Sequence, residues 1–134
     1  MATDQPRTFK KTERLCSLKL IEALFADKHH SLSAYPLRAV FMTTDAFEHE
    51  PVQVLISVSK RRFHHAVDRN RVKRQVREAY RQHKHLLWPA VPQEKGLSLA
   101  FLWLSDEHFP SNVVEQKVVN LLTRIAEHLR QSQS

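Results

Sequence analysis

The side chains best suited to chemistry in this 134-residue chain are ten lysines and arginines crowded between positions 60 and 84. The same stretch holds two acids, Asp68 and Glu78, so it carries a net charge of +8. The other 109 residues carry 11 basic and 12 acidic side chains and sum to −1. A cationic field confined to one short stretch is typical of a surface that binds a polyanion such as nucleic acid.

This basic stretch is nearly without the acids that would form i,i+4 pairs on a solvated helix, since only Glu78 is well placed, near Arg74 and Arg81. Asp68 is predicted to cap a helix over residues 69–85. That boundary puts Arg69 and Arg71 in the first turn, where the helix dipole disfavours cations and a bound phosphate would reverse the penalty. Replacing both by alanine is therefore expected to weaken nucleic-acid binding with little loss of fold stability.

Other kinds of site find little support in the sequence. The nine histidines include the neighbours His29–His30 and His64–His65, whose side chains point apart in a helix or strand, and no zinc-ligand motif is present. Cys16 has no context that marks a nucleophile, and the single glycine excludes a glycine-rich phosphate loop. We therefore predict no catalytic residue, no metal ligand and no cofactor bound by the protein alone. His64 and His65 are better explained as extra donors to phosphate or sugar.

The composition, 42% hydrophobic and 26% charged, predicts one folded domain spanning residues 1–134. Residues 1–16 are polar and basic and are predicted to form a flexible arm, and residues 131–134 a frayed tail. A lone cysteine suits a reducing cytoplasm. The sequence contains no apolar run of about 18 residues, so no membrane association is expected.

Hydrophobic periodicity predicts the elements that would position the basic stretch. A first helix from a Ser17 cap to about residue 28 shows one apolar face, and a last helix begins at about residue 110. Strands are predicted at 29–35 (an edge strand), 37–44, 52–59 and 97–104, the last buried on both faces. The basic helix is then the crossover of a strand–helix–strand unit in a small α/β sandwich. Ile21 and Phe25 on the first helix could face an open sheet surface beside it, where an unpaired base could stack.

The segments 57–60 (SVSK) and 66–78 (AVDRNRVKRQVRE) resemble the signature of the bacterial ribonuclease P protein family. The family pattern is a strand ending in a VSK-like segment, followed by A-V-x-R-N-R-x-K-R-x-x-R, and each of its defining positions is met. Weaker similarity covers most of the chain except the extreme termini. One departure is that the family often has Gly after the first helix, where 26–29 (ADKH) stands here.

The resemblance implies a two-layer α/β (α+β) sandwich of the ribosomal protein S5 domain 2-like class. This fold has a four-stranded sheet, three helices and a left-handed βαβ crossover, which periodicity alone would not predict because most crossovers are right-handed. It also implies an accessory protein subunit of an endoribonuclease. The catalytic RNA subunit, with Mg²⁺ ions held by the RNA, would remove the 5′ leader of precursor tRNA, and no protein partner would be required.

The resemblance also assigns the site residues. The R-N-R helix would contact the RNA subunit, while a cleft between the first helix and the sheet would hold the single-stranded leader. Ile21, where the family often has Phe, and Phe25 would belong to this cleft, with Phe41 as an aromatic on the sheet side. Lys60, Arg61 and Arg62 at the strand end would supply positive field. The helix residues predicted to bind RNA are Arg69, Asn70, Arg71, Lys73, Arg74, Arg77 and Arg81.

Two alternatives use the same charge differently. A ribosomal or ribosome-assembly protein would bind ribosomal RNA without affecting tRNA maturation. A self-sufficient metal-dependent nuclease would cleave RNA with Mg²⁺ and no RNA subunit, although the paired carboxylates of such an enzyme are missing from the basic region.

Overall fold

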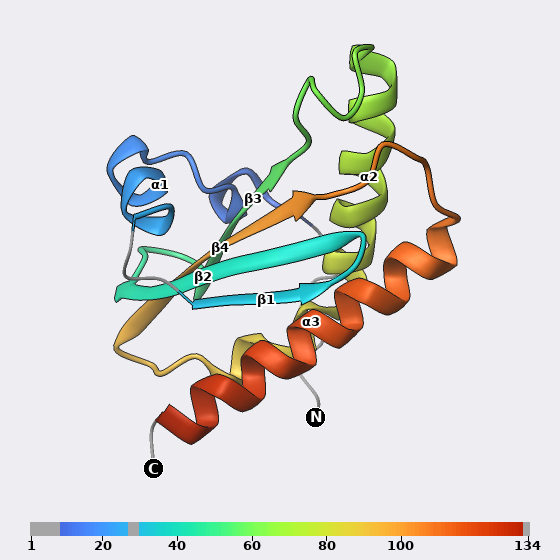
Figure 1. The fold of residues 1–134 in the computed structure, drawn as a ribbon. Coiled ribbons are helices and arrows are strands. Elements are labelled where there is room, and N and C mark those ends of the chain that lie inside the picture. Colours follow the sequence, from blue (N-terminus) through green and yellow to red (C-terminus); the bar gives the residue numbers. More distant parts are fainter. Residues whose placement is uncertain (1–8, 27–29, 133–134) are drawn as a thin grey trace.

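The computed structural model describes residues 9–26 and 30–132, which form three α-helices and one four-stranded sheet (Figure 1). The helices are α1 (Leu18–Leu24), α2 (Ala66–His83) and α3 (Ser111–Ser132), and the strands are β1 (His30–Ala34), β2 (Leu37–Asp45), β3 (Val52–Ser57) and β4 (Lys95–Trp103). Short 3₁₀ turns are η1 (Lys11–Glu13), η2 (Lys84–Leu86) and η3 (Trp88–Ala90).

The sheet has the order β1-β2-β4-β3, in which β3 and β4 are parallel and the other pairs antiparallel. Helix α2 connects β3 to β4, so the predicted strand–helix–strand unit is confirmed. Strand β4 lies between two neighbours, as its nearly continuous apolar sequence predicted, and β1 is the predicted edge strand. The predicted α/β architecture with four strands and three helices is confirmed.

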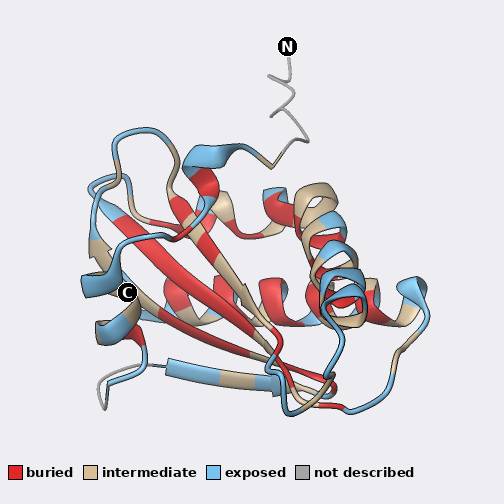
Figure 2. Cartoon of the chain, turned by 90° about the horizontal axis from the view of Figure 1, so that it is seen from above, coloured by how far each residue is buried: buried red, intermediate tan, exposed pale blue. Residues whose placement is uncertain are grey.

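Side-chain alternation divides the core between the two faces of the sheet. Leu97, Leu99 and Phe101 of β4 pack with α2 and α3 in the larger cluster, whereas Ala100 packs with Leu24 of α1 in a smaller one. Helix α3 runs beneath the sheet in Figure 1, while α1 sits above one part of the opposite face. Figure 2 marks the residues along each strand and helix that are buried. The fold is therefore a two-layer sandwich whose second face is only partly covered, by α1.

Two helix boundaries differ from the prediction. Ser17 caps α1 as expected, since its Oγ accepts a hydrogen bond from the Leu20 amide at 3.3 Å, but α1 ends at Leu24 rather than near residue 28. Helix α2 begins at Ala66 with His65 as the N-cap residue, three residues earlier than predicted. The prediction that Asp68 caps this helix is wrong, because Asp68 lies inside the first turn.

The segment from residue 9 to residue 16 is packed against the fold, so the prediction of a flexible arm is wrong for these residues. The Leu15 amide donates to the Val54 carbonyl at 2.9 Å, and Leu15 itself is buried. Glu13 is fully buried, and its Oε1 lies 2.9 Å from Nζ of Lys84, at the far end of α2. Residues 1–8 and 133–134 of the predicted arm and tail lie outside the described residues, and α3 continues regularly to Ser132.

Candidate nucleic-acid interface

The start of α2 at Ala66 places Arg69 and Arg71 in the second turn of the helix. The dipole penalty predicted for a first-turn cation does not apply there, because the effect falls off within the first turn. Arg69 also has a structural role, since its Nη1 donates to the backbone carbonyls of Phe63 and His64, both at 2.9 Å. Arg69 is half-buried and closes the loop before α2, whereas Arg71 is exposed.

The same loop is fixed from a second side by the β4–α3 connection. Asp68 Oδ1 lies 3.0 Å from His108 Nε2, and the His108 ring stacks on Phe63 with a centroid separation of 4.5 Å and an interplanar angle of 16°. Arg62 pairs with Asp106 at 3.2 Å. These contacts hold residues 59–65 in one position relative to α2, so the cations of the loop and of the helix belong to one rigid surface.

Five of the predicted RNA-binding cations make no ion pair, side-chain hydrogen bond or cation–π contact with any residue that the structure describes; they are Lys60, Arg61, Arg71, Lys73 and Arg74. Arg81 instead holds Glu78 through its Nε, 3.0 Å from Oε2, which lowers the pKa of the Glu78 carboxyl and raises the pKa of Arg81. Asn70 is exposed beside the unpaired arginines. The positive surplus is therefore concentrated on the loop and on the middle of α2.

Arg77 differs from its neighbours because its Nε is buried and has no hydrogen-bond partner among the described residues. Burial lowers the pKa of Arg77, and the nearby charges of Arg14 and Arg74 lower it further. Sequence reasoning assigned Arg14 only to the basic arm. Its place beside α2 depends on a backbone bridge with Val54 of β3, 40 residues away in sequence.

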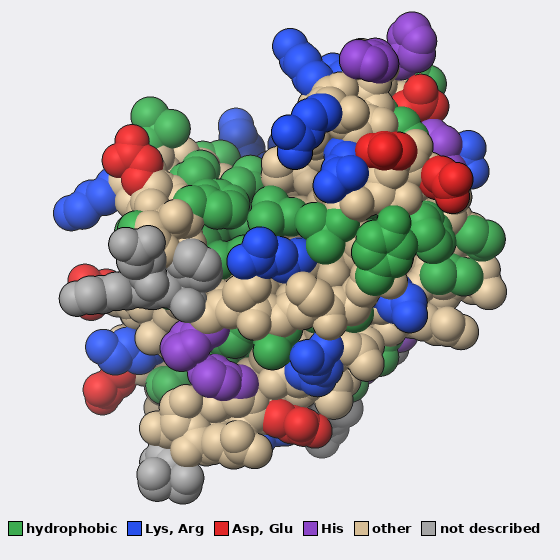
Figure 3. All heavy atoms as spheres, in the orientation of Figure 1, with side chains coloured by type: hydrophobic (Ala, Val, Ile, Leu, Met, Phe, Trp, Pro, Cys, Tyr) green, Lys and Arg blue, Asp and Glu red, His purple; other side chains and the backbone are tan. Residues whose placement is uncertain are grey.

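A hollow with an apolar floor lies between α1 and α2, over the uncovered part of the sheet (Figure 3). Leu55 of β3 and Leu102 of β4 are half-buried and belong to the same cluster as Ile21 of α1. Phe25, one helical turn after Ile21, is 45% exposed. The structure thus brings Ile21 and Phe25 to the face of the sheet predicted to form the cleft.

Phe41 does not belong to this cleft, and its assignment there is wrong. Its side chain is 1% exposed and lies in the cluster on the opposite face, where its ring centroid is 5.4 Å from that of His128 on α3. The neighbours Val40 and Met42 belong instead to the α1-side cluster. Because side chains of a strand alternate between faces, an error of one residue in register transfers an aromatic from one face to the other.

Arg38 lies on the same face of the sheet as the cleft, and sequence reasoning did not identify it. It is paired in register with Leu102, which in turn is paired with Ser57, so these side chains share the α1-side face. Arg38 Nε donates to Ser31 Oγ at 2.7 Å on the neighbouring edge strand, which leaves its remaining N–H groups available. The signal in the sequence was a single cation among apolar residues in a strand, at the position whose neighbours Leu37 and Ala39 are buried.

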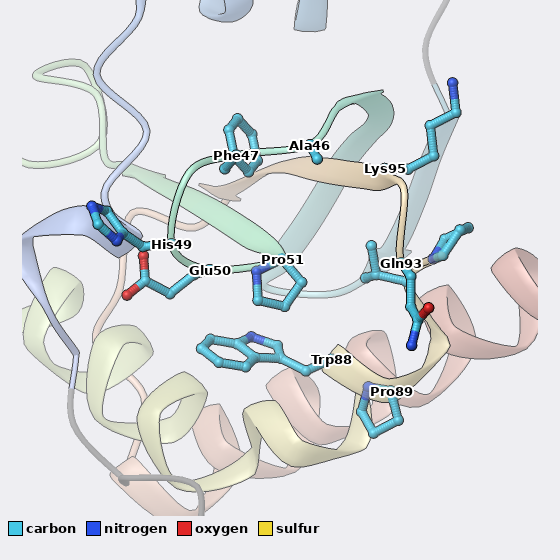
Figure 4. Close-up of a pocket in the computed structure, with 11 residues that line it drawn as sticks. Ala46, Phe47, His49, Glu50, Pro51, Trp88, Pro89, Gln93 and Lys95 are labelled. Atoms are coloured by element: carbon cyan, nitrogen blue, oxygen red, sulfur yellow. The ribbon is translucent and has the colours of Figure 1, made fainter.

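Two further hollows lie away from the unpaired cations. One, of about 600 Å³, lies between the opposite flank of α1 and the end of β2, and its walls include Leu20, Met42 and Thr44. Another, of about 410 Å³, lies between the β2–β3 connection and the segment before β4 (Figure 4). Trp88 at its wall is fixed by donating Nε1 to Tyr80 at 2.9 Å. Of the predicted site residues, none lines either hollow.

No group of three or more His, Cys, Asp or Glu side chains in the described part of the chain could hold a metal ion. Among the helices that the structure describes, none combines the length and hydrophobicity required of a membrane-spanning segment.

The family model for ribonuclease P matches residues 9–126. The chain belongs to the ribonuclease P protein family. The ribonuclease P protein component of Porphyromonas gingivalis is 42% identical over 125 residues, covering 90% of both chains. That of Chlorobium phaeobacteroides is 36% identical over 129 residues and covers 88% of both. The family resemblance predicted from the R-N-R segment is thereby confirmed, and the chain is a protein component of the tRNA-processing ribonuclease P.

Solved ribonuclease P proteins share the fold. The Thermotoga maritima protein is 25% identical with a TM-score of 0.67, covering 84% of this chain and 97% of that one. A Staphylococcus aureus ribonuclease P protein mutant, at 20% identity, has a TM-score of 0.65 and covers 87% of this chain and 90% of its own, which supports the fold alone.

Proposed function

We propose that this chain is an RNA-binding accessory subunit that positions precursor tRNA on a catalytic RNA, with phosphodiester hydrolysis carried out by the RNA and its Mg²⁺ ions. The observation that carries the proposal is the rigid surface of five unpaired cations on α2 and on the loop before it. Phosphate contacts of this kind fix position and orientation without reading sequence.

The catalytic RNA is the partner best suited to the cationic surface. Arg71 and Arg74 are exposed on α2, while Lys60 and Arg61 extend from the loop that Arg69 and His108 hold in place. A loop fixed in this way loses little backbone entropy on binding, so its charges can act together with those of α2 on the regularly spaced phosphates of an RNA helix.

The single-stranded 5′ leader of precursor tRNA fits the hollow between α1 and α2. Its apolar floor offers Leu55 and Leu102, and Phe25 offers an exposed aromatic face for stacking of an unpaired base. Arg38, at the edge of the same floor, is placed to contact a leader phosphate. Such a cleft accepts many leader sequences, because stacking and phosphate contacts are tolerant of base identity. We expect the protein to act in the cytoplasm.

The decisive experiment is cleavage of precursor tRNA at low Mg²⁺ by a cognate RNA subunit, with and without this protein. Acceleration by the protein, and a smaller acceleration by the Arg71→Ala variant, are the expected results. No acceleration, with the protein bound only to ribosomal RNA, would support a ribosome-assembly role instead. Cleavage by purified protein and Mg²⁺ without the RNA subunit would show that the chain is itself a nuclease.

A further inference from the structure

We propose that Arg14 and Arg77, which both lie against the ring of Phe9, form together with Arg74 a binding site for one phosphate group of RNA. The site lies at the outer edge of β3 beside α2. It rests on the proposed RNA-binding function and adds to it two residues, Phe9 and Arg14, that precede the first helix and lie outside the basic stretch of residues 60–84.

The geometry of this three-arginine site centres on Phe9. The guanidinium carbons of Arg14 and Arg77 each lie 6.0 Å from the centroid of the Phe9 ring. Phe9 is itself held edge-on against the buried ring of Tyr80, with a centroid separation of 6.0 Å. The aromatic ring therefore holds both cations beside it by cation–π attraction. Arg74 lies on α2 three residues before Arg77, which places both arginines on the same side of the helix.

The backbone around Arg14 is fixed by buried contacts. On one side the Leu15 amide donates to the Val54 carbonyl at 2.9 Å, and on the other Glu13 forms its buried ion pair with Lys84. The second carboxylate oxygen of Glu13 accepts a hydrogen bond from the Lys10 amide at 2.7 Å. Arg14 is consequently presented to α2 by an ordered segment, and the guanidinium groups of Arg14 and Arg77 are held at one aromatic ring before any ligand binds.

The charges of this site are not balanced within the described residues. Glu13 is engaged by Lys84, and Glu78 by Arg81, so the nearest acids along the chain are already paired. Arg77 has a buried Nε without a hydrogen-bond acceptor, and burial together with Arg14 and Arg74 lowers its pKa. Gathering cations in this way opposes folding unless an anion compensates them, since like charges repel and a buried donor without an acceptor is costly.

A phosphate group matches the site better than a carboxylate does. Guanidinium groups present planar pairs of N–H donors that suit the tetrahedral oxygens of phosphate, and three of them can share one such group. The position also suits an RNA ligand, because Arg74 already belongs to the unpaired cations of α2. A backbone phosphate bound here would extend the RNA contact from α2 to the edge of the sheet.

The test compares Arg14→Gln with Arg130→Gln, which removes the same charge from an exposed position near the end of α3. Inorganic phosphate is titrated into the free protein while the Nε–H signals of arginine are followed by ¹H–¹⁵N NMR. The signals of Arg14 and Arg77 are expected to shift together along one saturable curve, which Arg14→Gln abolishes and Arg130→Gln preserves. Affinity for the cognate catalytic RNA is then measured across a salt series.

Arg14→Gln should weaken RNA binding about tenfold and make the log–log salt slope shallower by roughly 0.7–0.9, the value of one phosphate contact. Phe9→Leu keeps the apolar contact with Tyr80 but removes the aromatic face, and about threefold weakening is expected. If both variants bind RNA as tightly as the wild type while Arg71→Ala does not, the three-arginine site is refuted and the RNA-binding function stands. If Arg71→Ala is also without effect, both proposals fail.

Discussion

Replacing Arg69 by alanine should destabilise the fold, whereas replacing Arg71 by alanine should weaken RNA binding and leave the fold intact. The two arginines flank Asn70 in the R-N-R segment and carry the same charge, but only Arg69 is tied to the protein, through the carbonyls of Phe63 and His64. Arg71 is exposed on α2 without an ion-pair partner among the described residues. The pair therefore provides its own control.

The magnitude follows from the two hydrogen bonds that Arg69 donates. A hydrogen bond from a charged donor contributes about 1.5–3 kcal/mol when buried and less when half-exposed, so the loss of both bonds should cost about 1–3 kcal/mol. For a domain of this size, 1 kcal/mol corresponds to roughly 3–5 °C in Tm. We expect Arg69→Ala to lower Tm by about 3–15 °C and Arg71→Ala to change it by no more than about 2 °C.

Thermal unfolding followed by circular dichroism measures the first effect, and filter binding of the catalytic RNA measures the second. Arg71→Ala is expected to weaken RNA binding about tenfold, since one charge-assisted contact is lost. An equal Tm for both variants would refute the assignment of Arg69 to the fold. If Arg69 has no structural role, the double variant Arg69→Ala/Arg71→Ala should be no less stable than the wild type. That is also the outcome predicted by a first-turn position for both arginines.

Three further predictions follow from the buried contacts and the unpaired cations. Lys84→Met should lower the free energy of unfolding by about 3–5 kcal/mol because Glu13 stays buried without its partner, and adding Glu13→Gln should restore part of the loss; an unchanged urea midpoint would contradict this. Burial raises the pKa of Tyr80, so the stability that depends on its neutral phenol is complete below about pH 10, where the unfolded chain ionises it, and declines as the pH rises further. In a Tyr35→Phe background, phenolate absorbance should therefore appear only together with loss of circular dichroism, and ionisation of the native fold would contradict the burial. Finally, affinity for RNA should fall with a log–log salt slope of roughly −3.5 to −4.5 if five phosphates are engaged, and a slope near zero would refute the electrostatic contact.

Local sequence patterns predicted most of the elements. The alternation of residues 52–59 and the apolar run of residues 97–104 each became a strand of the parallel pair, and the basic segment became α2 with Asn70 and Arg71 exposed. In these segments, burial and local periodicity favour the same structure, so no tertiary information was needed.

The errors occurred where tertiary contacts override local preference. Asp68 has the chemistry of an N-cap, but its carboxylate lies against His108, 40 residues away in sequence. Residues 9–16 look like a polar arm, yet Glu13 is buried by its pair with Lys84, 71 residues away. Neither partner can be identified from spacing. Phe41 was misplaced for a different reason, because a strand covered on both faces gives no alternation from which to choose a side.

The central claim, that the chain holds the leader of precursor tRNA while an RNA performs the hydrolysis, is tested most directly by a ratio of affinities. The RNA–protein particle is titrated with precursor tRNA and with the same tRNA lacking its leader. The affinity for precursor tRNA divided by the affinity for the leaderless tRNA should be roughly 5- to 150-fold higher with the protein than without it. This is the equivalent of about 1–3 kcal/mol for one stacked base, and Phe25→Ala should reduce the increase. A ratio that is the same with and without the protein would contradict the claim.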